Sequence, residues 1–157
     1  MSVTQSEIEL YIIKVREEKK KIAIKEAKKA VRQHLANLTP VYPTALEGIS
    51  FTPPKTGMYQ RLQFVISRPT DPVLGTGYYR ENIEVQIFVV DKLDVGTTNA
   101  ETRAELIRDW FHKGLTLTEG TFRMHVLRTP HVSSAATAAD KIIVPILIPL
   151  TVEVYKN

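Results

Sequence analysis

Alternation of apolar and polar residues over three stretches limits the fold of this chain more than any other feature. It occurs in residues 59–67 (YQRLQFVIS), 80–90 (RENIEVQIFVV) and the closing run 142–155 (IIVPILIPLTVEVY). A period of two is typical of strands that bury one face. A shorter run, TFRMHVLR, has the same pattern. The expected inward residues are Leu62, Phe64, Ile66, Ile83, Val85, Ile87, Val89, Phe122, Met124, Val126, Val144, Ile146, Ile148, Leu150, Val152 and Val154.

Two prolines in the closing run bear on the place of that strand in the sheet. Pro145 and Pro149 fall on the face opposite to the inward residues. A proline has no backbone N–H to donate, so it is normally confined to edge strands or bulges. We therefore predict that this half of the strand is an edge or is bulged. The run is apolar on both faces, so we also expect something to cover it.

The first 38 residues predict one long helix over residues 4–37. No proline or glycine occurs before Pro40, and Thr4 with Glu7 fits a capping box. Apolar residues follow helical spacing in two sets that do not join into one stripe. We expect the second set to face the core and the first to face a neighbouring subunit. The first set is Ile8, Tyr11, Ile12 and Val15, and the second is Ile24, Ala27, Val31, Leu35 and Leu38.

A second helix is predicted from about residue 99 to 113. Thr98 with Glu101 forms another candidate capping box, and Gly114 fits the position after the helix end. A short strand is expected near 45–49. The order is then α-β-β-β-α-β-β, in a single domain over 1–157, with the helix in 1–38 and the sheet in 44–155. This order predicts an α+β fold, an antiparallel or mixed sheet flanked by the two helices.

Composition excludes several classes of function. The chain has no cysteine, which excludes disulfides, thiolate chemistry and zinc sites that need sulfur. The N-terminus lacks the pattern of a signal peptide, and no apolar run is long enough to span a bilayer. We therefore expect a protein of the cytoplasm without a membrane partner. The net charge of +4 lies in residues 1–38, which hold nine Lys and Arg against five Asp and Glu.

No residue pattern predicts catalysis. The histidines at 34, 112, 125 and 131 lack metal-binding spacing, and no nucleophile elbow surrounds a serine. The glycine pair at 75–77 lacks the other parts of a phosphate loop. We expect no enzyme activity, no metal and no cofactor. Three long loops remain, at 68–79, 91–98 and 128–140, and the last is rich in small residues and expected to be mobile.

The stretch FTPPKTGMYQRL, residues 51–62, contains two prolines that restrict the backbone where the chain enters the first long strand. It resembles the tail terminator, or tail completion, proteins of long-tailed bacteriophages. The matching pieces, in order, are KEAKKAVRQHLANL, PTALEGISFTPP, GMYQRLQFVIS, ENIEVQIFVVD, DVGTTNAETRAELIRDWF, HKGLTLTEGTFRMHVL and IPLTVEVY. The likeness covers roughly residues 22–155.

The resemblance implies a structural protein of the virion. Such proteins form a hexameric ring on the tail tube at its head-proximal end, stop tube growth and present a surface to the head–tail connector. DNA would pass through the lumen without sequence-specific binding. Candidate partner contacts are the polar loop residues Arg68, Asp71, Asp91, Asp94, Arg128 and His131, and candidate subunit contacts are Tyr59, Arg61, Ile8, Ile12 and Val15.

Two other functions stay open at this point. One is a head-completion or neck adaptor protein, which would bind the connector without capping the tube. The other is a non-viral nucleic-acid-binding α+β domain that uses the basic helix, through Lys19, Lys20, Lys21, Lys28 and Lys29. Its binding would weaken steeply with salt, because phosphate contacts release counterions.

Overall fold

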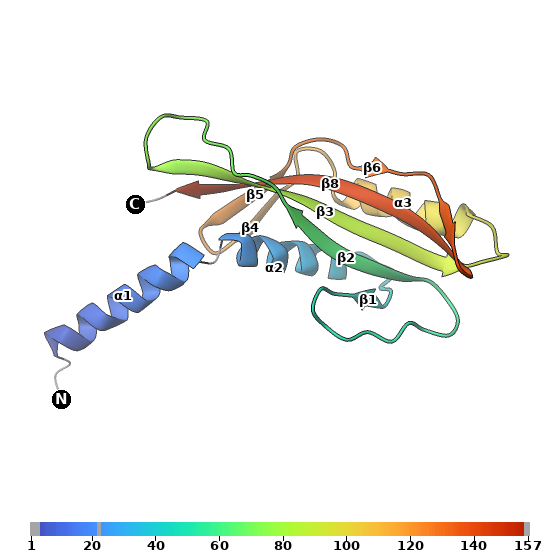
Figure 1. The fold of residues 1–157 in the computed structure, drawn as a ribbon, viewed down its shortest axis with the longest axis horizontal. Coiled ribbons are helices and arrows are strands. Elements are labelled where there is room, and N and C mark those ends of the chain that lie inside the picture. Colours follow the sequence, from blue (N-terminus) through green and yellow to red (C-terminus); the bar gives the residue numbers. More distant parts are fainter. Residues whose placement is uncertain (1–3, 22, 156–157) are drawn as a thin grey trace.

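A pair of long antiparallel strands runs through the whole protein (Figure 1). The computed structural model describes residues 4–21 and 23–155, with side chains for 4–13 and 23–155. Strands β3 (Tyr78–Lys92) and β8 (Lys141–Tyr155) pair over all fifteen residues of each. At about 3.3 Å per residue the pair is about 46 Å long. These strands form the axis on which the other elements are placed.

The other strands extend the sheet on both sides of this axis, in the order β1-β2-β3-β8-β5-β4. The pair β1–β2 is parallel and all others are antiparallel, so the sheet is mixed, as expected for an α+β fold. The shorter strands are β1 (Thr44–Ala45), β2 (Tyr59–Ile66), β4 (Thr116–Glu119), β5 (Phe122–Val126), β6 (His131–Val132) and β7 (Ala136–Ala138).

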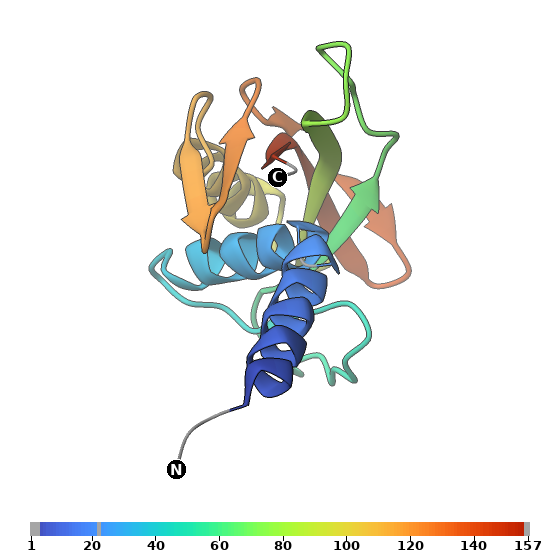
Figure 2. The same ribbon diagram turned by 90° about the vertical axis from the view of Figure 1, so that its left-hand side faces the viewer.

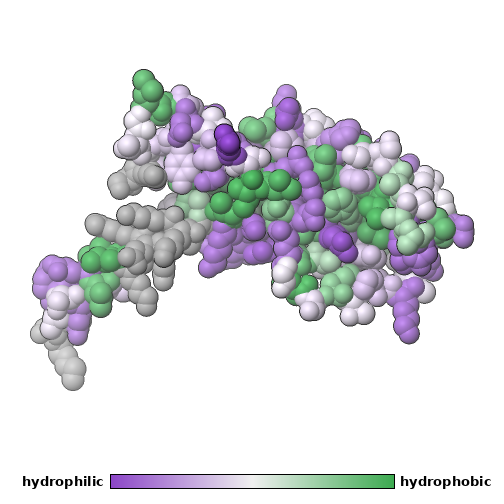
Figure 3. Space-filling model, in the orientation of Figure 1, coloured by the Kyte–Doolittle hydropathy of each residue, from purple (hydrophilic) through white to green (hydrophobic). Residues whose placement is uncertain are grey.

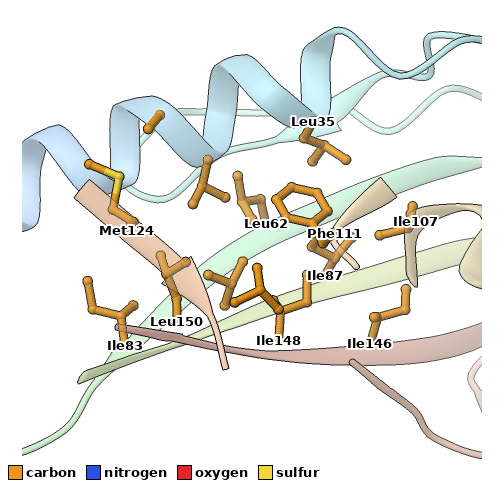
Figure 4. Packing of buried hydrophobic residues seen from close by; sticks show 14 of the residues in the cluster. Leu35, Leu62, Ile83, Ile87, Ile107, Phe111, Met124, Ile146, Ile148 and Leu150 are labelled. Carbon is orange, nitrogen blue, oxygen red and sulfur yellow. The ribbon is translucent and has the colours of Figure 1, made fainter. Parts of the chain in front are cut away.

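The core lies between the helices and one face of this curled sheet. Figure 2 shows β4 and β5 on one side and β2 on the other, with α2 crossing between them. In Figure 4, Leu35 of α2 points toward the strands, and Phe111 fills the space between. The inward residues predicted for β3, β5 and β8 are all buried. Of the inward residues predicted for β2, only Leu62 is buried. The end of this strand extends beyond the helices that cover the core, so Ile66 is exposed.

Two helices occupy the region predicted as one, namely α1 (Gln5–Lys21) and α2 (Ala23–Ala36). The capping box of Thr4 and Glu7 is present, with both hydrogen bonds at 3.3 Å. Helix α2 buries its apolar stripe against the core, whereas α1 extends away from the body (Figure 1). The sequence at 16–21, REEKKK, has no apolar side chain to continue that stripe. The single long helix is therefore a wrong prediction, and the two apolar sets belong to different helices.

The helix after β3 differs from its prediction at both ends. Helix α3 spans Thr98–Trp110, and its N-cap is Thr97, without a side-chain capping bond. The predicted capping box of Thr98 and Glu101 is thus absent. The helix stops before Phe111, whose ring is fully buried and whose backbone is no longer helical. Gly114 lies beyond the helix end, where its N–H donates to the carbonyl of Val126 at 2.9 Å.

The prolines were predicted to mark an edge or a bulge, but β8 is a central strand between β3 and β5. Their carbonyls accept hydrogen bonds from Ser133 and Leu127, so their backbone polar groups point away from β3. On that side β8 pairs with three short strands, at residues 141–143, 146–147 and 150–153. Each proline falls in a gap between two of these strands, where no N–H is needed. Segment 128–140, predicted to be a mobile loop, supplies β6 and β7, so five strands follow α3 in place of two.

Candidate interaction surfaces

The face of the sheet opposite the helices is a candidate interaction surface. Its side chains come from alternate residues of β2, β3 and β8, and none of them belongs to the core cluster. We call it the open face. It carries Arg61, Gln63, Val65, Glu84, Gln86, Phe88, Val90, Lys141, Ile143, Pro145, Leu147 and Pro149.

One end of the open face forms a shallow hollow of about 360 Å³. Cross-strand pairing builds its floor, because Val90 stands opposite both Tyr59 and Ile143. Its charged lining residues are both basic, Arg61 and Lys141. The hollow is lined by Tyr59, Arg61, Gln63, Phe88, Val90, Ala138, Lys141 and Ile143. An apolar floor with a cationic rim suits an apolar segment that carries negative charge.

The other end of the open face is a polar network. Arg80 Nε donates to the Tyr78 hydroxyl at 2.8 Å, and this bond raises the pKa of Arg80. The Tyr78 hydroxyl donates to Glu153 at 3.4 Å, and His125 lies 3.5 Å from the same carboxylate. Tyr155 packs on Tyr78 with ring centroids 4.8 Å apart. These side chains satisfy one another, so this end lacks the apolar character of the hollow.

Helix α1 exposes apolar side chains around its described part. Tyr11 is 70% exposed and Leu10 is 68% exposed. Ile8, Ile12 and Ile13 are also exposed, and Figure 3 shows green atoms on this helix. The side chain of Val15, predicted as a subunit contact, lies outside the described residues. Large apolar side chains left exposed on a helix make it a candidate interaction surface.

The loops at the two ends of the β3–β8 pair each expose an apolar tip. The β2–β3 connection carries Val73 and Leu74, of which Leu74 is fully exposed. The β3–α3 connection carries Leu93 and Val95 at the far end of β3. The hydrogen bond from Leu93 N–H to the carbonyl of Asp140, 3.1 Å, holds this second loop against the start of β8. The two tips are thus separated by the length of the sheet.

The predicted partner residues are distributed over these regions and do not form one cluster. Arg68 and Asp71 belong to the β2–β3 connection, and Asp94 to the opposite end. Arg128 and His131 are exposed near β6. Asp91 is different, because it is 7% exposed and its Oδ1 accepts the N–H of Lys92 at 2.8 Å.

The predicted subunit contacts fall on two separate features. Tyr59 and Arg61 line the hollow, whereas Ile8 and Ile12 are exposed on α1. Tyr59 is largely buried and packs against Phe51 of the proline-rich segment, with ring centroids 5.5 Å apart. The other lining residues of the hollow were not predicted from the sequence, although the apolar outward positions of the closing strand indicated that something covers it.

A buried arginine was also missed. Arg103 of α3 is 4% exposed, lies over the Tyr42 ring and donates to Gln60 Oε1 at 3.3 and 3.4 Å. Its Nη1 has no hydrogen-bond partner, and burial lowers the pKa of Arg103. No carboxylate within the described part of the chain forms an ion pair with it. Arg103 is a charged residue, and nothing in the sequence of α3 indicated that its side chain would be buried.

The described residues contain no cluster of three or more potential metal ligands. Across residues 4–21 and 23–155, no helix has both the length and the apolar character to cross a membrane. His34 is held between helices, with its Nε2 2.8 Å from the carbonyl of Trp110, and burial lowers its pKa.

Comparison with known proteins identifies the family. A family model described as phage tail terminator protein matches residues 26–150. No curated protein matches the chain. A solved structure whose title states no function is 24% identical, with a TM-score of 0.63 over 90% of this chain and 98% of that one. A second, titled "Virion of native gene transfer agent (GTA) particle", is 19% identical, with a TM-score of 0.61 over 85% of this chain and 99% of that one. These two likenesses show the fold, while the family match covers most of the sequence, and the chain therefore belongs to the phage tail terminator protein family.

Proposed function

We propose that the protein forms a ring of six copies at the head-proximal end of a phage tail tube, stops tube growth and provides the surface that joins the head connector. Membership of the tail terminator family makes it a structural component of a phage tail. The proposed ring adds no catalysis and needs no cofactor. DNA would pass through its lumen without sequence-specific contacts.

The observation that carries this proposal is the presence of exposed apolar loop tips at both ends of one rigid strand pair. A terminator must hold two different partners at once, the tube and the neck. The tip of Val73 and Leu74 and the tip of Leu93 and Val95 belong to loops at opposite ends of a strand pair that is about 46 Å long, from the rise of 3.3 Å per residue. Exposed apolar patches mark protein interaction sites. Each tip is thus suited to one partner.

The first experiment is electron microscopy of the cognate tail tube protein polymerised with and without this protein. The proposal expects shorter tubes with an extra ring of density at one end. Tubes of unchanged length without end density would contradict it.

Charged substitutions can then separate the two ends. The variant Val73→Asp/Leu74→Asp and the variant Leu93→Asp/Val95→Asp each place charge on one tip. One of them should lose tube capping, and the other should still cap tubes but fail to join heads. Thr76→Asp, an exposed polar residue of the first loop, is the matched control and should retain both functions. Two variants that both cap and join as the wild type does would refute the two-ended arrangement.

A neck adaptor protein would use the same two-ended geometry, and the tube experiment separates the two roles. An adaptor binds the connector and leaves tube growth unchanged. The nucleic-acid alternative has less support, because Lys28 and Lys29 lie 3.6 and 3.1 Å from Glu47 and Glu119. These ion pairs occupy two of the four Lys and Arg residues of α2. Lys19, Lys20 and Lys21 have side chains outside the described residues.

A further inference from the structure

We propose that α1 of one copy docks in the hollow on the open face of the next copy. The inference rests on the ring of the proposed function and adds the contact that would link its subunits. The occupant is a defined segment of a second copy of this chain, residues 4–13 of α1.

The first support is the state of α1. Its capping box fixes the first turn, so the segment begins as a helix without help from the body. Its apolar side chains nevertheless remain exposed, at 41% for Ile12 and 70% for Tyr11. In proteins most of the stability of a helix comes from tertiary packing of one of its faces. Helix α1 therefore needs a surface that its own body does not supply.

The second support is the chemistry of the hollow. Its floor is apolar, with Phe88 and Ile143 half-buried beside the buried Val90, and no helix of the described residues contributes to its lining. Both charged residues that line it, Arg61 and Lys141, are cations. In residues 4–13 the charged residues are Glu7 and Glu9, both anions, whereas the basic residues of α1 follow in the sequence from Lys14 onward. Apolar surface would thus meet apolar surface, with opposite charges at the rim.

The third support is the position of the two surfaces. The hollow lies where β3 ends and β8 begins, whereas α1 projects from the opposite end of the molecule and points away from it (Figures 1 and 2). Lys29 of α2 contacts Glu119 of β4, which places the middle of α2 beside the β4–β5 hairpin. A surface at one end that binds a surface at the other makes a head-to-tail contact. Repetition of such a contact closes into a ring when the rotation permits.

Disulfide trapping tests this contact directly, because the chain has no native cysteine. Ile12→Cys places a thiol on α1, and Ala138→Cys places one at the exposed rim of the hollow. The double variant should give a ladder of covalent multimers on oxidation, and a mixture of the two single variants should give dimers only. Ile12→Cys with Arg123→Cys, an exposed residue of β5 outside the hollow, is the control and should remain monomeric.

The trapping is carried out on the protein alone and on protein bound to tail tubes, with tube capping scored in parallel. Capped tubes with a ladder support both proposals. Capped tubes without a ladder overturn the docking of α1 and leave the terminator function standing. Without capping, the terminator function falls, and the ladder still decides the docking. An oxidised monomer with an internal crosslink would show that α1 folds back on its own hollow, and would also overturn the inference.

A charge exchange provides a second readout. Glu9→Lys should reduce crosslinking of the double cysteine variant several-fold, because the new cation would be repelled by Arg61 and Lys141. Arg61→Glu combined with Lys141→Glu should restore it in the presence of Glu9→Lys. Equal crosslinking in all three backgrounds would contradict the proposed rim contacts.

Discussion

Replacement of Trp110 by phenylalanine should weaken the link between α2 and α3. The indole Nε1 donates to the carbonyl of His34 at 2.6 Å, and its ring stacks on the imidazole with centroids 4.7 Å apart. Trp110→Phe removes the donor and part of the stacked area. The reciprocal bond, from His34 to the backbone carbonyl of Trp110, does not depend on the indole.

The expected loss follows from these contacts. A hydrogen bond of this kind contributes about 1 kcal/mol net. An aromatic pair contributes about 0.5–1.5 kcal/mol beyond its buried area, of which a phenyl ring keeps a part. The carbonyl of His34 retains a second donor, the N–H of Asn37 at 3.3 Å, so it is not left unsatisfied. We expect the free energy of unfolding to fall by about 2 kcal/mol.

Thermal and urea denaturation measure this loss. For a domain of this size, 2 kcal/mol corresponds to a decrease in Tm of about 4–8 °C. Asp109→Asn changes the exposed neighbour of Trp110 and should alter the free energy of unfolding by less than about 0.5 kcal/mol. If Trp110→Phe also changed it by less than about 0.5 kcal/mol, the indole contacts would not be what holds the two helices together.

Two further predictions concern titratable and buried charged groups. Because burial lowers the pKa of His34, the unfolded chain binds a proton there first as pH falls. Stability should be full above about pH 6.5 and decrease below it, and the decrease should be smaller in His34→Gln, as measured by Tm at pH 8 and pH 5.5. Arg103→Met removes a buried guanidinium that has neutral partners and a free Nη1, so the unfolding free energy should change by less than about 1 kcal/mol. A loss above about 2 kcal/mol in chemical denaturation would show that the charge is compensated after all.

The long strands were predictable because a sheet face has a direct period in the sequence. Every second residue of β3 and β8 had to be apolar to fill the core, and residues such as Ile83 and Val144 are buried as predicted. The very short strands β6 and β7 could not be found in this way, since two or three residues carry no measurable period. They are held by pairing to β8, which is a tertiary effect.

The position of β8 was mispredicted for a related reason. A proline excludes a donor on one side of a strand only, and the sequence does not tell which side faces which neighbour. The hollow was not predicted either, because it depends on which strands pair and in which register. Tyr59, Val90 and Ile143 are far apart in sequence and become neighbours only through strand register.

The spacing of the two prolines along β8 also divides the protein by stability. Pro145 and Pro149 separate three short ladders, and only two of them, those of β6 and β7, attach the segment from residue 127 to 140 to β8. Single hydrogen bonds from Leu127 and Ser133 to the proline carbonyls complete the attachment. The β3–β8 ladder is continuous and shares none of these bonds. Local opening of such a segment costs less than global unfolding. Residues 127–140 should therefore exchange their amide hydrogens before the β3–β8 pair does, so that one border of the subunit opens more easily than its centre.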